Sequence, residues 1–157
     1  MRIVVAAVIE RADRRILIGQ RRHDDTSPLK WEFPGGKVEP GESAEQALAR
    51  ELKEELAATL LKSAPIGRVV HQYAGTSEEL EILFYAAQIR ESELAPRAFE
   101  QVVWVLPKEL GQYDFLAANA QLVANLATGR IKPVEILESH GTETHPTTPG
   151  QNTDSGR

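Results

Sequence analysis

The chain carries three glutamates, Glu51, Glu54 and Glu55, within five consecutive residues of a predicted helix. At about 100° per residue, these side chains fall within an arc of roughly 100° on the helix surface. Carboxylates at this spacing repel one another, so keeping them together calls for a compensating charge. A Gly35-Gly36 loop lies just before the helix, and we interpret the cluster as oxygen ligands for a hard divalent cation. The simpler alternative is a solvated acidic face paired with neighbouring basic residues.

The helix that carries the glutamates is predicted to run from Ser43, a good N-cap, to about Leu56. Its core-facing stripe consists of Leu48, Leu52 and Leu56. Strands are predicted at Ile3–Ile9, Arg15–Gln20, a short piece ending at Phe33–Gly36, Ile66–Tyr73, Leu80–Ile89 and Val102–Leu106. Further helices are predicted at Pro107–Leu110 and Phe115–Ala127. We expect the first two strands to form a hairpin. The order predicts an α/β fold, a three-layer α/β/α sandwich in which a mixed sheet carries a helix on each face.

The length of 157 residues predicts one domain, which we place at residues 1–138. From Ser139 to Arg157 the composition turns to Thr, Pro, Gly, Ser, Asn and His without periodicity. We therefore expect a disordered tail over residues 139–157. The chain has no cysteine, which excludes disulfides and thiolate zinc sites.

The apolar run from Met1 to Ile9 is too short for a signal peptide and lacks a cleavage site. No stretch approaches the roughly 20 apolar residues that a membrane span needs, so we expect a cytoplasmic protein without a membrane partner. The net charge of −5 argues against binding a nucleic-acid polymer, whose backbone requires a basic face. That charge would also repel a phosphate ester, and bound divalent cations would remove the conflict.

The spacing of charged residues after Gly36 resembles the Nudix box, the signature of the Nudix hydrolases. The matching residues are Gly36, Glu42 and the run Arg50-Glu51-Leu52-Lys53-Glu54-Glu55. Two positions depart from the box, because Ala57 stands in place of a glycine and Ala58 in place of a bulky aliphatic residue. The resemblance covers roughly Met1 to Thr128 and implies a Nudix-like fold.

The resemblance also implies a cofactor, Mg²⁺ or Mn²⁺, and a set of site residues. The implied ligands are a carbonyl near Gly36, Glu51, Glu54, Glu55 and, as a further candidate, Glu100, which could equally be an exposed loop residue. Glu42 and Arg50 would form a structural ion pair that holds the loop onto the helix. Either Glu51 or Glu54 could accept the proton of the attacking water, and the sequence does not choose between them.

Within the family, the chain is most similar to the MutT branch, the 8-oxo-dGTP diphosphatases, over Trp31–Glu39 and Tyr113–Asn119. In that branch an asparagine at the start of the last helix reads the oxidised guanine, and Asn119 occupies the matching position. An amide offers both a donor and an acceptor, which suits the O6 and N7–H edge of 8-oxoguanine. The alternative for Asn119 is an ordinary residue at a helix N-terminus.

Other aromatic and basic residues are candidates for substrate contact. Arg22 and Phe33 are candidates for contact with the base or phosphates, with a core role as the alternative for Phe33. Tyr73 is a weaker stacking candidate, and His23 lies in a loop that could touch substrate. His71 is expected to be a polar strand residue without a catalytic role.

The resemblance thus implies a Mg²⁺-dependent pyrophosphohydrolase that cleaves oxidised dNTPs such as 8-oxo-dGTP to the monophosphate and pyrophosphate. Such an enzyme sanitises the nucleotide pool and so serves DNA repair. One alternative is hydrolysis of CTP, 5-methyl-dCTP or undamaged dNTPs, although the members compared carry aspartate where Asn119 stands. Another is a Nudix-fold nucleotide sensor without hydrolysis, although sensors tend to lose box glutamates that this chain keeps. The expected partner is a small nucleotide, and both monomer and homodimer stay open.

Overall fold

The structure of the chain, a computed structural model, describes residues 1–72, 75 and 77–144. Its centre is a five-stranded mixed sheet with the order β4-β1-β6-β5-β8. These strands are β1 (Arg2–Ile9), β4 (Gly35–Lys37), β5 (Leu60–Gln72), β6 (Glu79–Ile89) and β8 (Thr142–Glu143). β1 runs parallel to β6, and the other neighbouring pairs are antiparallel. β1 is therefore a central strand whose two edges are both paired.

A second, three-stranded antiparallel sheet has the order β3-β2-β7. It consists of β2 (Ile16–Gln20), β3 (Trp31–Glu32) and β7 (Gln101–Val105). The expected hairpin between the first two strands is therefore wrong. β2 pairs with β7 along its whole length, and a single bridge between Glu10 and Ile16 links it to the end of β1. Because β4 and β6 already occupy both edges of β1, β2 has to pair elsewhere.

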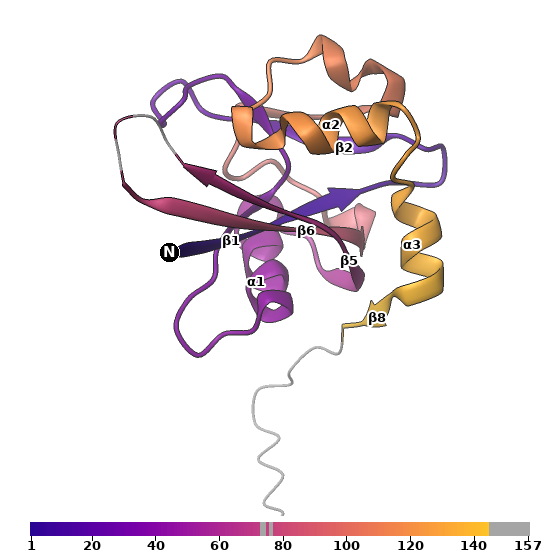
Figure 1. Cartoon of the computed structure of the whole chain (residues 1–157). Coiled ribbons are helices and arrows are strands. Elements are labelled where there is room, and N and C mark those ends of the chain that lie inside the picture. Colours follow the sequence, from indigo (N-terminus) through magenta and orange to yellow (C-terminus); the bar gives the residue numbers. More distant parts are fainter. Residues whose placement is uncertain (73–74, 76, 145–157) are drawn as a thin grey trace, which may run out of the picture.

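The helix α1 (Ala44–Leu56) covers one face of the five-stranded sheet (Figure 1). Its stripe of Leu48, Leu52 and Leu56 is 0% exposed. The stripe packs in one core cluster with Val5 and Ala7 of β1. Burying each leucine contributes about 1.5–3 kcal/mol to folding, so this face fixes the helix on the sheet.

The opposite face is covered by α2 (Ala120–Ala127), which Figure 1 shows on the other side of the sheet from α1. Ala6 and Val8 of β1 point to this face and pack in a cluster with Leu122 and Leu126. β1 thus sends alternate side chains into both cores, as expected for a strand buried on both faces. The prediction of a three-layer α/β/α sandwich with a mixed sheet is confirmed.

The remaining helical segments are short. They are α3 (Pro133–His140) and three 3₁₀ turns, η1 (Glu91–Glu93), η2 (Pro107–Gln112) and η3 (Ala117–Asn119). The predicted helix over Phe115–Ala127 is thus a 3₁₀ turn followed by α2. Within residues 1–72, 75 and 77–144, no helix has the length and apolar character needed to cross a membrane.

The chain continues in regular structure past residue 138, where the disordered tail was expected to begin. Ser139 and His140 belong to α3, and Thr142–Glu143 pair with Lys62 and Ser63 of β5. The periodicity missed α3 because eight residues supply few core contacts, chiefly Leu137 against Ala64 and Ala86. His145 and the rest of residues 145–157 lie outside the described residues, as does Tyr73.

Both ends of α1 are capped. Ser43 is the N-cap, with its hydroxyl accepting the Gln46 N–H at 3.1 Å while the Gln46 amide oxygen accepts the Ser43 N–H at 2.9 Å. At the other end Ala57 is the C-cap, with a left-handed backbone at φ 57° and ψ 16°. This is the position at which the family signature has glycine. The alanine therefore closes the helix at a conformational cost that glycine would avoid.

Ala57→Gly is expected to raise the free energy of unfolding by about 0.5–1 kcal/mol. Glycine relieves the left-handed strain of roughly 1–2 kcal/mol and loses part of that gain to backbone entropy. Urea unfolding should show a higher midpoint. Ala49→Gly, in the interior of the same helix, is the matched control and should lower stability by about 1 kcal/mol. Equal destabilisation by both changes would contradict the strain at Ala57.

Candidate active site

The loop before α1 is held to the helix by a bidentate ion pair. Arg50 Nε donates to Glu42 Oε2 at 2.7 Å and Arg50 Nη2 donates to Glu42 Oε1 at 2.9 Å. The Arg50 guanidinium also donates to the Lys37 carbonyl at 2.9 Å. The bond from Arg50 holds the pKa of Glu42 down at about 2, and the same bond raises the pKa of Arg50. Glu42 therefore stays ionised, and the loop from Lys37 to Glu42 is tied down at both ends.

Arg50 also contacts two of the clustered glutamates. Its Nη1 donates to Glu51 Oε1 at 2.9 Å and to Glu54 Oε2 at 3.3 Å. The Glu51 side chain is 13% exposed and that of Glu54 is 59% exposed. The guanidinium therefore offsets the repulsion between a buried and a solvent-facing carboxylate.

The Gly35-Gly36 turn brings the chain against these carboxylates. A Cβ at Gly36 would lie 2.5 Å from each carboxylate oxygen of Glu51. A Cβ at Gly35 would overlap the Val5 carbonyl of the neighbouring strand. Both glycines are therefore required by close approach, one to the sheet and one to Glu51.

Glu55 is the most perturbed of the glutamates. Burial raises its pKa to about 9, helped by the nearby carboxyls of Glu32 and Glu51, while the Gly35 N–H that it accepts opposes the shift. Glu32 is also buried, which raises its pKa, while the Arg21 guanidinium 3.0 Å away opposes that shift. Glu55 is thus protonated at neutral pH. Its buried position and the neighbouring carboxyls both disfavour a further negative charge.

This cluster fits a divalent cation by its chemistry. The donors are carboxylate oxygens beside a glycine backbone, which is the oxygen-rich set that Mg²⁺ and Mn²⁺ prefer. A cation would offset the burial and the neighbouring carboxyls that raise the pKa of Glu55. Among the residues that the structure describes, no three acidic or histidine side chains stand close enough to hold an ion as placed. Glu54, which is exposed and bound to Arg50, would have to turn toward the other carboxylates.

Glu100 is exposed and stands just before β7, two residues after Ala98, whose N–H donates to the Glu55 carbonyl at 3.2 Å. Its Oε1 accepts the backbone N–H of His23 at 3.0 Å and lies 2.6 Å from His23 Nδ1. These bonds lower the pKa of Glu100 and raise the pKa of His23. Glu100 therefore bonds to His23 of another loop. This agrees with the alternative considered for Glu100, an exposed loop residue.

A cavity of about 330 Å³ extends from the acidic cluster. Its lining includes Glu32, Glu55 and Gly36, together with Phe33 and Asn119. A larger hollow of about 760 Å³ lies between α2, α3 and the β1–β2 turn, and none of the α1 glutamates line it. Charge and chemistry, more than size, therefore single out the smaller cavity.

Asn119 is 5% exposed and is the N-cap residue of α2, although its side chain does not cap the helix. Its amide makes no hydrogen bond with any residue of the described chain. The amide is therefore available to a ligand in the cavity that Asn119 lines. Phe33 beside it is 4% exposed and stacks on Phe115 with ring centroids 5.3 Å apart. Phe33 is therefore both a core residue and a cavity wall.

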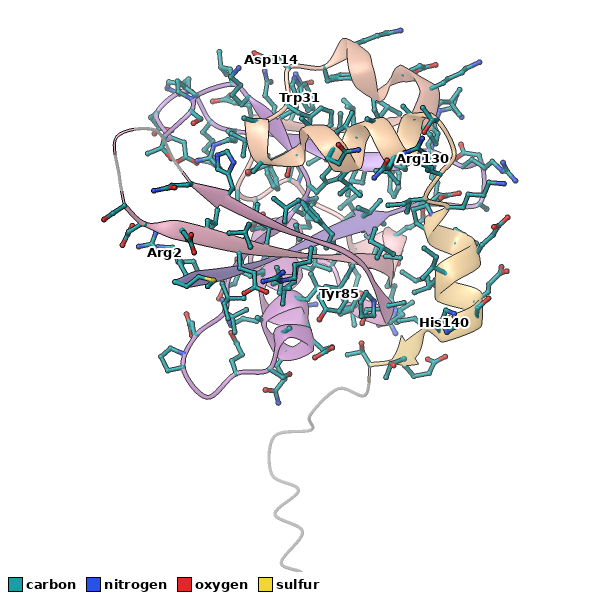
Figure 2. The ribbon with its side chains drawn as sticks, viewed as in Figure 1. Arg2, Trp31, Tyr85, Asp114, Arg130 and His140 are labelled. Atoms are coloured by element: carbon teal, nitrogen blue, oxygen red, sulfur yellow. The ribbon has the colours of Figure 1, made fainter. Side chains whose placement is uncertain are left out.

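The segment that carries Asn119 is anchored on β3. The Trp31 N–H donates to the Asp114 carbonyl at 2.9 Å, and the Leu116 N–H donates to the Trp31 carbonyl at 3.0 Å. Figure 2 shows Trp31 and Asp114 together above the sheet. The indole also makes an edge contact with Tyr113 at 5.0 Å between centroids. Asn119 thus takes its position from β3 as well as from its own turn.

The basic residues that line the cavity are Arg2, Arg21 and Lys37, whereas the predicted candidate, Arg22, does not line it. Arg22 turns away, and its Nη2 donates to the Arg97 carbonyl at 2.5 Å. The prediction also missed Glu32, the partner of Arg21. An acid between two aromatic residues, Trp31 and Phe33, was the available signal, because a charge in a buried strand needs a partner. His71 lies on β5, as expected.

Residues 1–126 match the NUDIX domain family. The chain belongs to the Nudix hydrolase family. A CTP pyrophosphohydrolase of Escherichia coli is 36% identical over 135 residues, which cover 84% of this chain and 96% of the relative. An 8-oxo-dGTP diphosphatase of Haemophilus influenzae is 32% identical over 123 residues, covering 78% of this chain and 89% of that protein.

The fold of this Nudix hydrolase also matches solved structures. The solution structure of the E. coli ORF135 protein superposes with a TM-score of 0.71 at 33% identity, covering 83% of this chain and 91% of that one. The predicted family, fold and enzyme class are thereby confirmed, and the relatives include both nucleotide hydrolases that the sequence suggested.

Glu55→Gln is expected to stabilise the metal-free Nudix hydrolase, increasingly so as the pH rises. Protonated Glu55 favours the folded state fully below its ordinary pKa of 4.5, and that contribution is lost as the pH rises through the folded-state pKa of about 9. Glutamine cannot ionise and escapes the loss, so a gain on the order of 5 kcal/mol is expected at pH 9 and less than about 1 kcal/mol at pH 5.

Urea unfolding in EDTA at both pH values measures this difference. Glu138→Gln, at an exposed site on α3, is the control and should show no such trend. A gain from Glu55→Gln that is the same at both pH values would contradict the buried, protonated state of Glu55.

Proposed function

We propose that this Nudix hydrolase is a Mg²⁺-dependent nucleoside triphosphate pyrophosphohydrolase that prefers 8-oxo-dGTP. The observation that carries the proposal is one cavity lined both by Glu55 of the acidic cluster and by Asn119, whose amide makes no hydrogen bond within the described chain. The acidic part suits a metal-bound polyphosphate, and the amide suits the edge of a base. The 8-oxo-dGTP diphosphatase among the relatives supports the same substrate. Removing oxidised dNTPs would sanitise the nucleotide pool and so serve DNA repair.

The acidic cluster would carry the hydrolysis. Glu51, Glu54 and Glu55 would hold Mg²⁺, or Mn²⁺, with a carbonyl near Gly36. When bound, the cation neutralises the polyphosphate, activates a water and stabilises the departing pyrophosphate. Glu51 or Glu54 would accept the proton of that water. The resemblance to the MutT branch points to attack at the β-phosphorus.

The second part of the cavity would read the base. Phe33 supplies an apolar wall, and the Asn119 amide can accept from N7–H and donate to O6 of 8-oxoguanine. Undamaged guanine has an acceptor at N7, so the same amide would be left with an unsatisfied group. Discrimination would follow from that lost hydrogen bond.

A second candidate substrate is CTP, with 5-methyl-dCTP and general dNTPs as variants of it. The observation in its favour is the 36% identity to a CTP pyrophosphohydrolase over 84% of this chain. A smaller pyrimidine would also fit the cavity of about 330 Å³. Substrate preference in a nucleotide panel separates the two candidates, and binding without turnover would indicate a sensor.

Asn119→Ala is expected to lower the preference for 8-oxo-dGTP over dGTP by about 10–100-fold, the effect of losing one or two hydrogen bonds in a buried site. The measurement is kcat/KM for 8-oxo-dGTP, dGTP and CTP with Mg²⁺, with monophosphate and pyrophosphate quantified. Asn125→Ala, also on α2 but bonded to Gln121, is the control and should leave the ratio unchanged. An intact preference in Asn119→Ala would overturn the proposed base recognition.

Glu54→Gln is expected to lower kcat by at least about 100-fold with a change in stability within about 0.5 kcal/mol. The small effect on folding follows from the 59% exposure of the Glu54 side chain. Activity assays and urea unfolding, run beside Glu138→Gln, check both parts. Full activity in Glu54→Gln would remove Glu54 from the proposed machinery.

A further inference from the structure

Arg2 stands at the edge of the same cavity. It belongs to β1, and the alternate residues Arg2, Val4 and Ala6 all line the cavity. This spacing of two is that of side chains on one face of a strand. Arg2 is itself exposed, so the guanidinium lies at the cavity mouth and not in its floor.

Arg2 has no ion-pair or hydrogen-bond partner for its side chain among the residues that the structure describes. At the candidate site, Arg21 and Arg50 are each paired with carboxylates, whereas Arg2 is not. Its five N–H donors are therefore free for a ligand. Glu78 and Glu79 line a neighbouring hollow with Arg2 but form no ion pair with it.

The strand register places Arg2 away from the acidic cluster. On β1, Val5 pairs with Gly36, whose position abuts Glu51. Arg2 lies three residues before Val5, which along an extended strand amounts to about 10 Å. That separation is comparable to the distance from the phosphates of a nucleotide to the far edge of its base. With the phosphates of a nucleotide at the acidic cluster, Arg2 would therefore lie toward the base.

We propose that Arg2 reads the nucleobase and favours guanine and cytosine bases over adenine. This inference rests on the proposed function, since it needs a nucleotide in the cavity. A guanidinium only donates, and its planar fork fits two adjacent acceptors. Guanine offers O6 with N7, and cytosine offers O2 with N3, whereas adenine sets its amino group beside each ring acceptor on the edges away from the sugar. In 8-oxoguanine, O6 has two lone pairs and can accept from both Arg2 and Asn119, while N7–H donates to Asn119.

The test compares the wild type with Arg2→Leu, Arg2→Lys and Arg130→Leu in the full chain. Arg130 is an exposed residue between α2 and α3 that lies across the molecule from Arg2 in Figure 2, so its replacement matches the change in net charge. The assay is kcat/KM for dGTP, dCTP and dATP with Mg²⁺. Arg2→Leu should lower kcat/KM about 10–100-fold for dGTP and dCTP and less than about 3-fold for dATP. Arg2→Lys should fall between, and Arg130→Leu should behave as wild type.

Two outcomes overturn the inference while leaving the proposed function in place. Unchanged ratios of dGTP and dCTP to dATP in Arg2→Leu would remove Arg2 from base recognition. An equal loss for all three nucleotides would make Arg2 a general attractor of anions.

A binding measurement separates this inference from a failure of the proposed function. Affinities for dGMP, dCMP and dAMP, followed by NMR titration in EDTA, need neither metal nor turnover. If the wild type hydrolyses none of the nucleotides, the proposed function fails, and Arg2 still predicts tighter binding of dGMP and dCMP that Arg2→Leu loses. Equal binding of the three monophosphates by the wild type would overturn the inference.

Discussion

The guanidinium of Arg50 is the interaction on which the candidate site depends. One planar group contacts Glu42 by two bonds, the Lys37 carbonyl, Glu51 and Glu54. These contacts join the glycine loop, the start of α1 and the clustered acids into one unit. Without the positive charge of Arg50, the carboxylates would repel one another and the loop would lose its link to the helix.

The two sheets explain how distant segments reach one cavity. β1 carries β4, with its glycines, on one edge and β6 on the other. The second sheet contributes Glu32 of β3 and, directly after the end of β2, Arg21, which donates to Glu32. The cavity is thus lined by strands of both sheets, by Glu55 in the last turn of α1, and by Ala118 and Asn119 of η3. Its polar residues come from segments that are far apart in the chain.

Local patterns in the sequence were sufficient for some of this. The leucine stripe, the Ser43 cap and the glutamate spacing all act within one helix, so α1 and its acidic face could be predicted. Strand pairing could not, because β2 and β7 are about eighty residues apart and nothing within β2 encodes that partner. The choice between Arg21 and Arg22 failed for a similar reason. It depends on the side on which Glu32 and the Arg97 carbonyl lie, which only the assembled fold determines.

The anchoring of Asn119 on Trp31 has an evolutionary consequence. The hydrolytic groups belong to α1 and its loop, whereas the amide sits on a separate turn fastened to β3 by two backbone bonds. Backbone bonds do not depend on side-chain identity, so the turn can exchange residues without disturbing the acids. A lineage could therefore retune which damaged or normal base it accepts while inheriting its bond-breaking apparatus intact. Such independence would let closely related enzymes diverge in substrate specificity and still share one hydrolytic chemistry.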